Sequence, residues 1–319
     1  MKGIIFIALA LALALFIESK LDNPFEQVEK LDRALSEKSP DIIYFGDSSV
    51  YLYAPNDPDR RSIASFLAGY SGREVVEISH AAYHLGIYEA YSEYVCNSEN
   101  RPKLAIVPIN LRVSFSEESA TRPAYQFNNQ IRWLKSGREG NTLPLRLWLR
   151  FYHLFGNDKE KESRLEEEWK SRTVYYNATP RGKVSDYLIE RPSSSEEVAG
   201  QFIFEYMPLI GESHGRISSL KKMVMNYESC GVKLLLYTSP IDYESGIGYI
   251  GSDFTAVVGQ NIKTIQNSVK NSNVVLVDMS FDLNASYFNY ISIPNEHLKQ
   301  DGREYVARKL SMLLDEENR

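Results

Sequence analysis

The sequence has few of the residues that build metal or redox sites. Its two cysteines, Cys96 and Cys230, stand far apart, which rules out a CxxC redox motif and a disulfide-rich mini-fold. Zinc-finger spacing is absent, and so are the Walker A, GxGxxG and GxSxG motifs. These absences argue against zinc-finger, P-loop and dinucleotide-binding proteins, and against the serine-hydrolase fold that carries GxSxG.

The chain also lacks an excess of positive charge. Lysine and arginine number 36 against 42 aspartates and glutamates, so the formal net charge is −6, and no basic stripe is visible. Binding to nucleic acid through release of counterions is therefore not expected. With 319 residues, 43% of them hydrophobic, the chain is long enough to bury a sizeable core of ordinary composition.

One long hydrophobic run is present, at the N-terminus. Residues Gly3 to Ile17 are uncharged and lie between Lys2 and Glu18. At about 1.5 Å per residue the run is short for a ~30 Å hydrocarbon layer, and no good cleavage site follows it, which favours an uncleaved signal anchor over residues 1–20. A buried N-terminal helix is the alternative. The anchor predicts Lys2 on the cytoplasmic side, a linker helix over residues 21–40 and an extracytoplasmic domain over 41–319.

The rest of the chain alternates short apolar runs with amphipathic segments, as in α/β proteins. The runs are of the kind buried on both faces of a parallel sheet: Asp41–Phe45, Glu74–Ile78, Leu104–Pro108, Lys233–Thr238 and Asn273–Asp278. Helical stripes are predicted over Arg216–Cys230 and over Gly302–Leu314, the latter including Tyr305. The pattern predicts a doubly wound, five-stranded parallel sheet in the flavodoxin-like order 2-1-3-4-5.

Between the third predicted strand and the Arg216 helix lie about a hundred residues, 111–215, far more than a usual crossover. We expect this segment to be a mostly helical insertion that caps the domain. Its charged run Asp158–Lys170 is predicted to be a solvated helix face, and Pro192–Ser195 a loop.

Polar and small residues follow several predicted strands. Gly46-Asp47-Ser48-Ser49 follows the first, a segment ending in Ala82 follows the second, Asn110 follows the third, and His297 precedes the last helix. Open α/β sheets hold their ligands at this edge. A serine there can point its hydroxyl into the crevice, although the same residues could simply cap a helix or form a turn.

In this order, GDSS, Asn110 and His297-Leu298-x-x-x-Gly302 resemble the SGNH (GDSL-type) hydrolase superfamily, especially its membrane-anchored members that act on envelope polysaccharides. The resemblance covers roughly two thirds of the chain and leaves out the insertion. It implies that Ser48 is the nucleophile and His297 its general base. It also implies that Asn110 stabilises the oxyanion together with the backbone N–H groups of Ser48 and Ala82.

The chain departs from the family pattern at two places. The usual glycine of the second block is Ala82 or a neighbour here, with Gly86 a less favoured alternative. The aspartate that normally stands three residues before the histidine is Pro294, which cannot orient an imidazole. We therefore expect a Ser–His dyad. A backbone carbonyl could orient the imidazole instead. Three side chains also remain open as substitutes for the missing acid: Asn295, Glu296 and the distant Asp278.

Two histidines and an arginine near the predicted crevice have alternative interpretations. His80 and His84 have the i, i+4 spacing of a metal-binding pair, but no third ligand is near in the sequence. We therefore expect neither a metal nor a cofactor, and we expect His80 to line the crevice. Arg112 could meet an anionic substrate or form a salt bridge.

Tyrosines and the two cysteines are also ambiguous. Tyr88, Tyr91 and Tyr94 could line a sugar platform, although their spacing favours packing of a helix. In the predicted topology Cys96 and Cys230 end neighbouring helices, so a disulfide is possible, and two separate buried thiols are the alternative.

The sequence thus predicts a membrane-anchored, serine-dependent acyl ester hydrolase or O-acyltransferase, with acetyl as the expected acyl group. Its predicted partners are an acylated cell-envelope carbohydrate and the membrane. The alternative is a catalytically inactive SGNH-like protein for envelope assembly or polysaccharide binding. Loss of the aspartate favours that alternative, and retention of Ser48, Asn110 and His297 opposes it.

Overall fold

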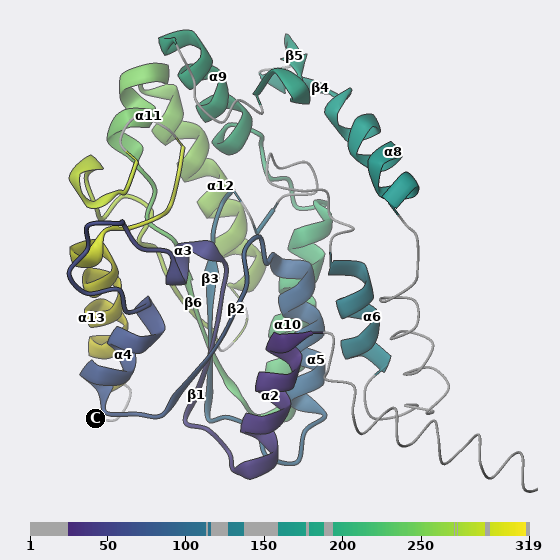
Figure 1. Ribbon diagram of the computed structural model, residues 1–319, viewed down its shortest axis with the longest axis vertical. Helices are drawn as coiled ribbons and strands as arrows, with labels where there is room; N and C mark the ends of the chain where they lie inside the picture. Colours follow the sequence, from purple (N-terminus) through teal and green to yellow (C-terminus); the bar gives the residue numbers. More distant parts are fainter. Residues whose placement is uncertain are drawn as a thin grey trace, which may run out of the picture.

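A five-stranded parallel sheet forms the centre of the molecule (Figure 1). The computed structural model describes residues 25–112, 114–115, 127–136, 159–176, 179–187, 194–270, 272, 274–290 and 294–316. The strands are β1 (Ile42–Gly46), β2 (Val75–Ser79), β3 (Leu104–Ile109), β6 (Lys233–Thr238) and β7 (Val275–Val277). Their spatial order is β2-β1-β3-β6-β7, so the predicted order 2-1-3-4-5 is confirmed.

The central strands are apolar throughout because helices cover both faces of the sheet. Every residue of β1 and β3 is buried. The edge strand β7 has only three residues, and its Val275 is exposed, as is common for short edge strands. The register pairs Gly46 with Ser79, which brings the carboxyl ends of β1 and β2 to the same edge of the sheet.

Two helical layers enclose the sheet, each with its own buried apolar cluster (Figure 1). One layer contains α2 (Glu26–Glu37), α5 (Leu85–Cys96), α10 (Gly215–Cys230) and α12 (Asp253–Val269). The other contains α4 (Ile63–Ser71) and α13 (Gln300–Glu316). The two predicted helical stripes correspond to α10 and α13. Leu310 and Leu314 are buried as expected, but Tyr305 is exposed because it lies on the solvent side of α13.

Three short elements lie near the carboxyl edge of the sheet: α3 (Ser48–Tyr51), α11 (Tyr243–Ile250) and the 3-10 helix η3 (Ala285–Tyr287). Figure 1 shows α3 directly above the end of β1. The chain therefore turns from the central strand straight into a short helix at this edge, which is where the candidate site lies.

The insertion is helical in part and also contains a hairpin that the sequence did not predict. Its described elements are α6 (Asn128–Ser136), α8 (Lys159–Lys170), β4 (Thr173–Tyr176), β5 (Thr179–Lys183), η2 (Val184–Tyr187) and α9 (Ser195–Tyr206). The short strands β4 and β5 pair antiparallel. The glutamates of α8 from Glu166 to Glu168 are exposed, as predicted, whereas Trp169 is buried.

The predicted loop Pro192–Ser195 is wrong at its last residue, because Ser195 begins α9. The Ser194 hydroxyl accepts a hydrogen bond from Glu197 N, and the Glu197 carboxylate accepts one from Ser194 N. This reciprocal pair is a capping box, which starts a helix where serine-rich composition alone suggests a loop.

The predicted signal anchor, residues 1–20, lies outside the described residues. The helix that follows, α2, buries Val28, Leu31 and Leu35 in the same apolar cluster as α5 and α10. Among the described parts of the chain, none of the helices has the length and hydrophobicity that crossing a bilayer requires.

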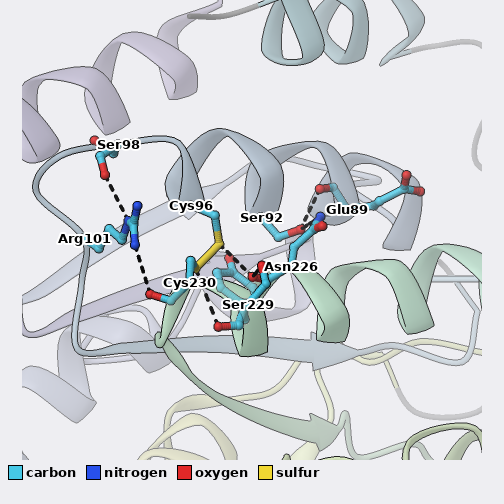
Figure 2. The surroundings of a disulfide bond; sticks show 9 residues. Glu89, Ser92, Cys96, Ser98, Arg101, Asn226, Ser229 and Cys230 are labelled. Atoms are coloured by element: carbon cyan, nitrogen blue, oxygen red, sulfur yellow. Dashed lines mark hydrogen bonds between the residues drawn. A yellow bond between two sulfur atoms is a disulfide. The ribbon is translucent and has the colours of Figure 1, made fainter. Parts of the chain in front are cut away.

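A disulfide joins Cys96, the last residue of α5, to Cys230, the last residue of α10 (Figure 2). The two Cα atoms are 5.4 Å apart. Close by, Asn226 Nδ2 of α10 donates to the Ser92 hydroxyl of α5, and Arg101 Nη1, from the segment after α5, donates to the Cys230 carbonyl. Of the two alternatives for the cysteines, the disulfide is confirmed.

We expect replacement of both Cys96 and Cys230 by serine to lower the free energy of unfolding by about 2–5 kcal/mol, because the bond closes a long loop in the unfolded chain. The residues are 134 apart in sequence. Urea unfolding of wild type and variant, each with and without reductant, measures the effect. Reductant should weaken only the wild type. Two free thiols per chain in denatured, unreduced wild-type protein would contradict the bond.

Candidate active site

Ser48 lies at the turn from β1 into α3, and its neighbours explain the turn. Gly46 allows a close approach: a Cβ on this residue would lie 2.6 Å from Cγ2 of Val50. The Asp47 carboxylate caps α3 by accepting a hydrogen bond from Ser49 N at 2.7 Å. The capping interpretation therefore holds for Asp47. Ser48 becomes the first residue of the helix, where its backbone N–H has no acceptor within the helix.

His297 lies in the segment between η3 and α13, and hydrogen bonds hold its backbone on both sides. His297 N donates to Asn295 Oδ1 at 3.1 Å, and Asn289 N donates to the His297 carbonyl at 2.9 Å. Asn295 Nδ2 in turn donates to the Tyr290 carbonyl. This arrangement places His297 Nε2 3.1 Å from Ser48 Oγ, a contact between residues 249 positions apart in the sequence.

The imidazole of His297 is neutral over most of the pH range. Burial lowers its pKa to about 4, and the positive charge of Arg112 acts in the same direction, while the Glu296 carboxylate opposes both. With the hydrogen on Nδ1, the free electron pair of Nε2 faces the Ser48 hydroxyl. The pair can then transfer the serine proton to the imidazole, as a nucleophile and its general base do.

This lowered pKa predicts the acid limb of the pH–rate profile. A base must be neutral to accept a proton, so kcat/KM should stay high below the usual histidine pKa of 6.5 and fall only as the pH drops through about 4. Measuring kcat/KM between pH 3.5 and 8 tests this. Burial raises the Asp47 pKa to about 6. If protonation of Asp47 causes a fall in kcat/KM near pH 6, that fall should be absent from the profile of the Asp47→Asn variant. An acid limb near 6.5 in both proteins would contradict the prediction.

Asn110 follows β3 and is buried beside Asp47. Its Oδ1 accepts a hydrogen bond from Arg112 N at 3.0 Å, which orients the amide nitrogen toward the turn that contains Asp47 and Ser48. Nδ2 lies 3.5 Å from Asp47 Oδ1. Asn110 therefore presents a hydrogen-bond donor to the residue that immediately precedes Ser48.

Ala82 lies in the turn after β2 and has a left-handed backbone conformation, with φ at 64°. Tyr83 N closes the turn by donating to the His80 carbonyl. Glycine adopts this conformation most readily, and alanine adopts it at a cost, so Ala82 occupies a position whose backbone favours glycine. The alternative Gly86 is excluded as an oxyanion donor, because its N–H donates to His84 Nδ1 in the first turn of α5.

Glu296, Asn295 and Asp278 do not orient the imidazole. The Glu296 carboxylate pairs with Arg112, Asn295 Oδ1 accepts the backbone N–H of His297, and Asp278 Oδ1 accepts from Thr238 Oγ1 and Ser280 N. Pro294 cannot supply an acceptor side chain. Among the described residues, the imidazole of His297 is therefore hydrogen-bonded to Ser48 and to none of the predicted substitutes for the acid.

Arg112 forms a buried salt bridge rather than an open anion site. Arg112 Nη2 lies 2.9 Å from Glu296 Oε2, and the exposed fractions of the two side chains are 11% and 0%. The Tyr206 hydroxyl donates to Glu296 from α9 of the insertion. A carboxylate oxygen of Glu205 is buried nearby, and this burial raises the pKa of Glu205 to about 7. Sequence reasoning missed Tyr206 and Glu205, because nothing local in α9 indicates that its end meets the segment carrying His297.

The other candidate residues have structural surroundings. His84 is buried and caps α5, whereas His80 is exposed with its ring 5.2 Å from that of Tyr83 and 5.5 Å from that of Phe127. Within the described residues no group of three potential metal ligands is found. Three tyrosines of α5 are buried, which confirms the packing interpretation: Tyr88, Tyr91 and Tyr94.

Comparisons with known proteins find no matching family model and no matching curated protein. Solved structures do match. A catalytic mutant of the acetylxylan esterase Axe2 from Geobacillus stearothermophilus is 12% identical, with 86% of this chain and 93% of that chain covered and a TM-score of 0.41. A putative lipolytic protein of the G-D-S-L family from Desulfitobacterium hafniense DCB-2 is 13% identical, with 85% and 97% covered and a TM-score of 0.39.

Proposed function

We propose that this protein is a serine-dependent acyl ester hydrolase or O-acyltransferase. The observation that carries the proposal is the 3.1 Å contact between Ser48 Oγ and His297 Nε2, in which burial keeps the imidazole neutral. The serine oxygen attacks the ester carbonyl carbon while its proton passes to Nε2. The protonated imidazole then gives that proton to the leaving alcohol, and the acyl group remains on Ser48.

The second half of the reaction uses the same two side chains. Water or a sugar hydroxyl gives its proton to His297 Nε2 and attacks the acyl carbon, after which the proton returns to Ser48 Oγ and the acid or new ester leaves. Both tetrahedral intermediates carry an oxyanion. We propose that the N–H groups of Ser48 and Ala82 and Nδ2 of Asn110 stabilise it. Asn110 Nδ2 lies 3.5 Å from Asp47 Oδ1, next to Ser48.

Asn110→Ala should lower kcat by roughly 10²–10³-fold if Nδ2 is one of these donors. The loss should appear mainly in kcat, because the charge on the oxyanion develops in the transition state. Ser114→Ala is the matched control, since Ser114 Oγ accepts from Asn110 N and the change leaves Nδ2 in place. Steady-state kinetics on an activated acetyl ester decides. An Asn110→Ala enzyme as fast as the Ser114→Ala control would remove Asn110 from the mechanism.

For the substrate we propose an acetylated carbohydrate of the cell envelope. The order of GDSS, Asn110 and His297 resembles membrane-anchored SGNH proteins that act on envelope polysaccharides, which supports this class. The disulfide between Cys96 and Cys230 also supports it, because such bonds persist in oxidising compartments outside the cytoplasm.

We further propose that residues 1–20 anchor the protein with its domain on the extracytoplasmic side. A chain that starts at Lys20 retains α2 with its buried Val28, Leu31 and Leu35 and should be released as a folded, soluble protein. A periplasmic-type reporter fused after Arg319 should be active in the full-length protein. Aggregation of the shortened chain, or a cytoplasmic reporter signal, would contradict the topology.

A fluorophosphonate probe tests whether Ser48 is an activated nucleophile. We expect stoichiometric labelling of folded protein at Ser48, together with release of acetate from acetylated envelope glycans or transfer of acetyl to them. A non-catalytic polysaccharide-binding protein is the second candidate, and the observation in its favour is that no carboxylate pairs with His297 among the described residues. Folded protein that binds glycan but stays unlabelled would establish this second candidate and overturn the first.

A further inference from the structure

Arg303 of α13 is fully buried, which is rare for an arginine and costs free energy unless its donors are satisfied. Its guanidinium makes four hydrogen bonds. Nη1 donates to Asp57 Oδ2 at 2.8 Å and to the Leu298 carbonyl at 2.7 Å. Nε donates to the Arg61 carbonyl and Nη2 to the Asp59 carbonyl. A buried cation with this many partners holds its neighbours in one geometry.

The partners of Arg303 come from two separate segments of the chain. Residues 54–61 follow α3, the helix that Ser48 begins, and Asp57 Oδ2 also accepts Ala54 N at 2.9 Å. Leu298 directly follows His297. One guanidinium therefore connects the segment behind the nucleophile to the residue beside the base.

A second contact reinforces the same connection. Gln300, the first residue of α13, accepts Asp59 N on its Oε1 at 2.9 Å. Leu298 is itself buried, and a Cβ on Gly302 would lie 3.1 Å from its Cβ, so the start of α13 packs closely against Leu298. The first turn of α13 thus positions the residue that follows His297.

We propose that Arg303 is a positioning residue that holds Ser48 and His297 at reacting distance. The proposal rests on the proposed function. His297 lacks a carboxylate partner among the described residues, so the position of its ring depends on how its backbone is held. A displacement of about 1 Å between reacting groups can lower the rate roughly 10²-fold. Loss of the hydrogen bonds from Arg303 should therefore lower kcat measurably.

The test compares Arg303→Lys with Arg308→Lys, a matched change on the same helix at a side chain that is 62% exposed. Lysine keeps the positive charge, but its ammonium group lacks the planar guanidinium with which arginine reaches all four acceptors. We expect kcat to fall roughly 10- to 100-fold in Arg303→Lys with KM changed less than about 3-fold. Arg308→Lys should match the wild type in both constants.

Asp57→Asn provides a second variant that keeps the arginine and the shape of its partner. Its control is Asp301→Asn, which changes an exposed carboxylate in the first turn of α13. Asp57→Asn should lower kcat in the same direction as Arg303→Lys, by a smaller factor, and Asp301→Asn should not. Variants that unfold at lower temperature but keep wild-type kcat when folded would overturn the positioning role.

The titration of His297, followed by NMR of its imidazole, separates this proposal from the proposed function. The pKa of about 4 depends on burial of the ring. In Arg303→Lys we expect the pKa of His297 to rise toward 6.5, whether or not the protein is an active enzyme. If wild-type protein takes up no fluorophosphonate, the proposed function fails, and the His297 titration still decides on Arg303. An unchanged His297 titration in folded Arg303→Lys would overturn the positioning role.

Discussion

Ser48→Ala and His297→Ala are each expected to lower ester turnover by roughly 10⁴-fold or more. In the proposed mechanism the serine oxygen forms the covalent bond and His297 Nε2, 3.1 Å away, takes its proton, so neither works without the other. The double variant should therefore be no slower than either single variant. Initial rates on an activated acetyl ester and on acetylated glycan, with protein folding checked by circular dichroism, measure the loss.

Ser49→Ala is the matched control for this prediction. Ser49 is the neighbouring serine and is 3% exposed. Ser49→Ala keeps the backbone N–H that donates to Asp47 Oδ1, so activity should stay near the wild-type value. Full activity in Ser48→Ala would overturn the mechanism, and loss of activity in Ser49→Ala alone would move the nucleophile by one residue.

Arg112→Met is expected to lower the free energy of unfolding by about 3–5 kcal/mol, because it leaves the fully buried Glu296 carboxylate without its cation. The Arg112→Met/Glu296→Leu variant should recover much of this loss, since removing both charges also removes the cost of burying them. Urea unfolding at neutral pH gives the values.

The exposed pair on α13 serves as the control for the buried pair. Arg308 and Glu304 form an i, i+4 bridge in which the arginine side chain is 62% exposed, and such pairs contribute little. Arg308→Met should therefore change the unfolding free energy by less than about 1 kcal/mol. If Arg112→Met and Arg308→Met lowered the free energy of unfolding by the same amount, the buried pair of Arg112 and Glu296 would contribute no more than the exposed pair, which would contradict the prediction.

Local patterns in the sequence were sufficient to predict the sheet. Runs such as Ile42–Gly46 and Leu104–Ile109 are continuously apolar because parallel strands covered on both faces have no solvent side. The order of the strands was expected from the doubly wound topology that such a pattern favours, and this topology placed Ser48, Asn110 and His297 near one edge. Prediction failed where local composition is ambiguous: the β4–β5 hairpin shows no strong alternation, and the capping box of Ser194 and Glu197 starts a helix at Ser195, where a loop residue was predicted.

By itself, then, the sequence determined where the strands lie and which polar residues follow them, because burial and turn chemistry are encoded within a few consecutive residues. Only the tertiary structure decided which distant groups meet. The pairing of Arg112 with Glu296 across 184 positions, the contact of Tyr206 with Glu296, and the four bonds of Arg303 depend on how separate segments pack. Such contacts leave no local pattern, because each partner is an ordinary polar residue in its own segment until the fold buries it.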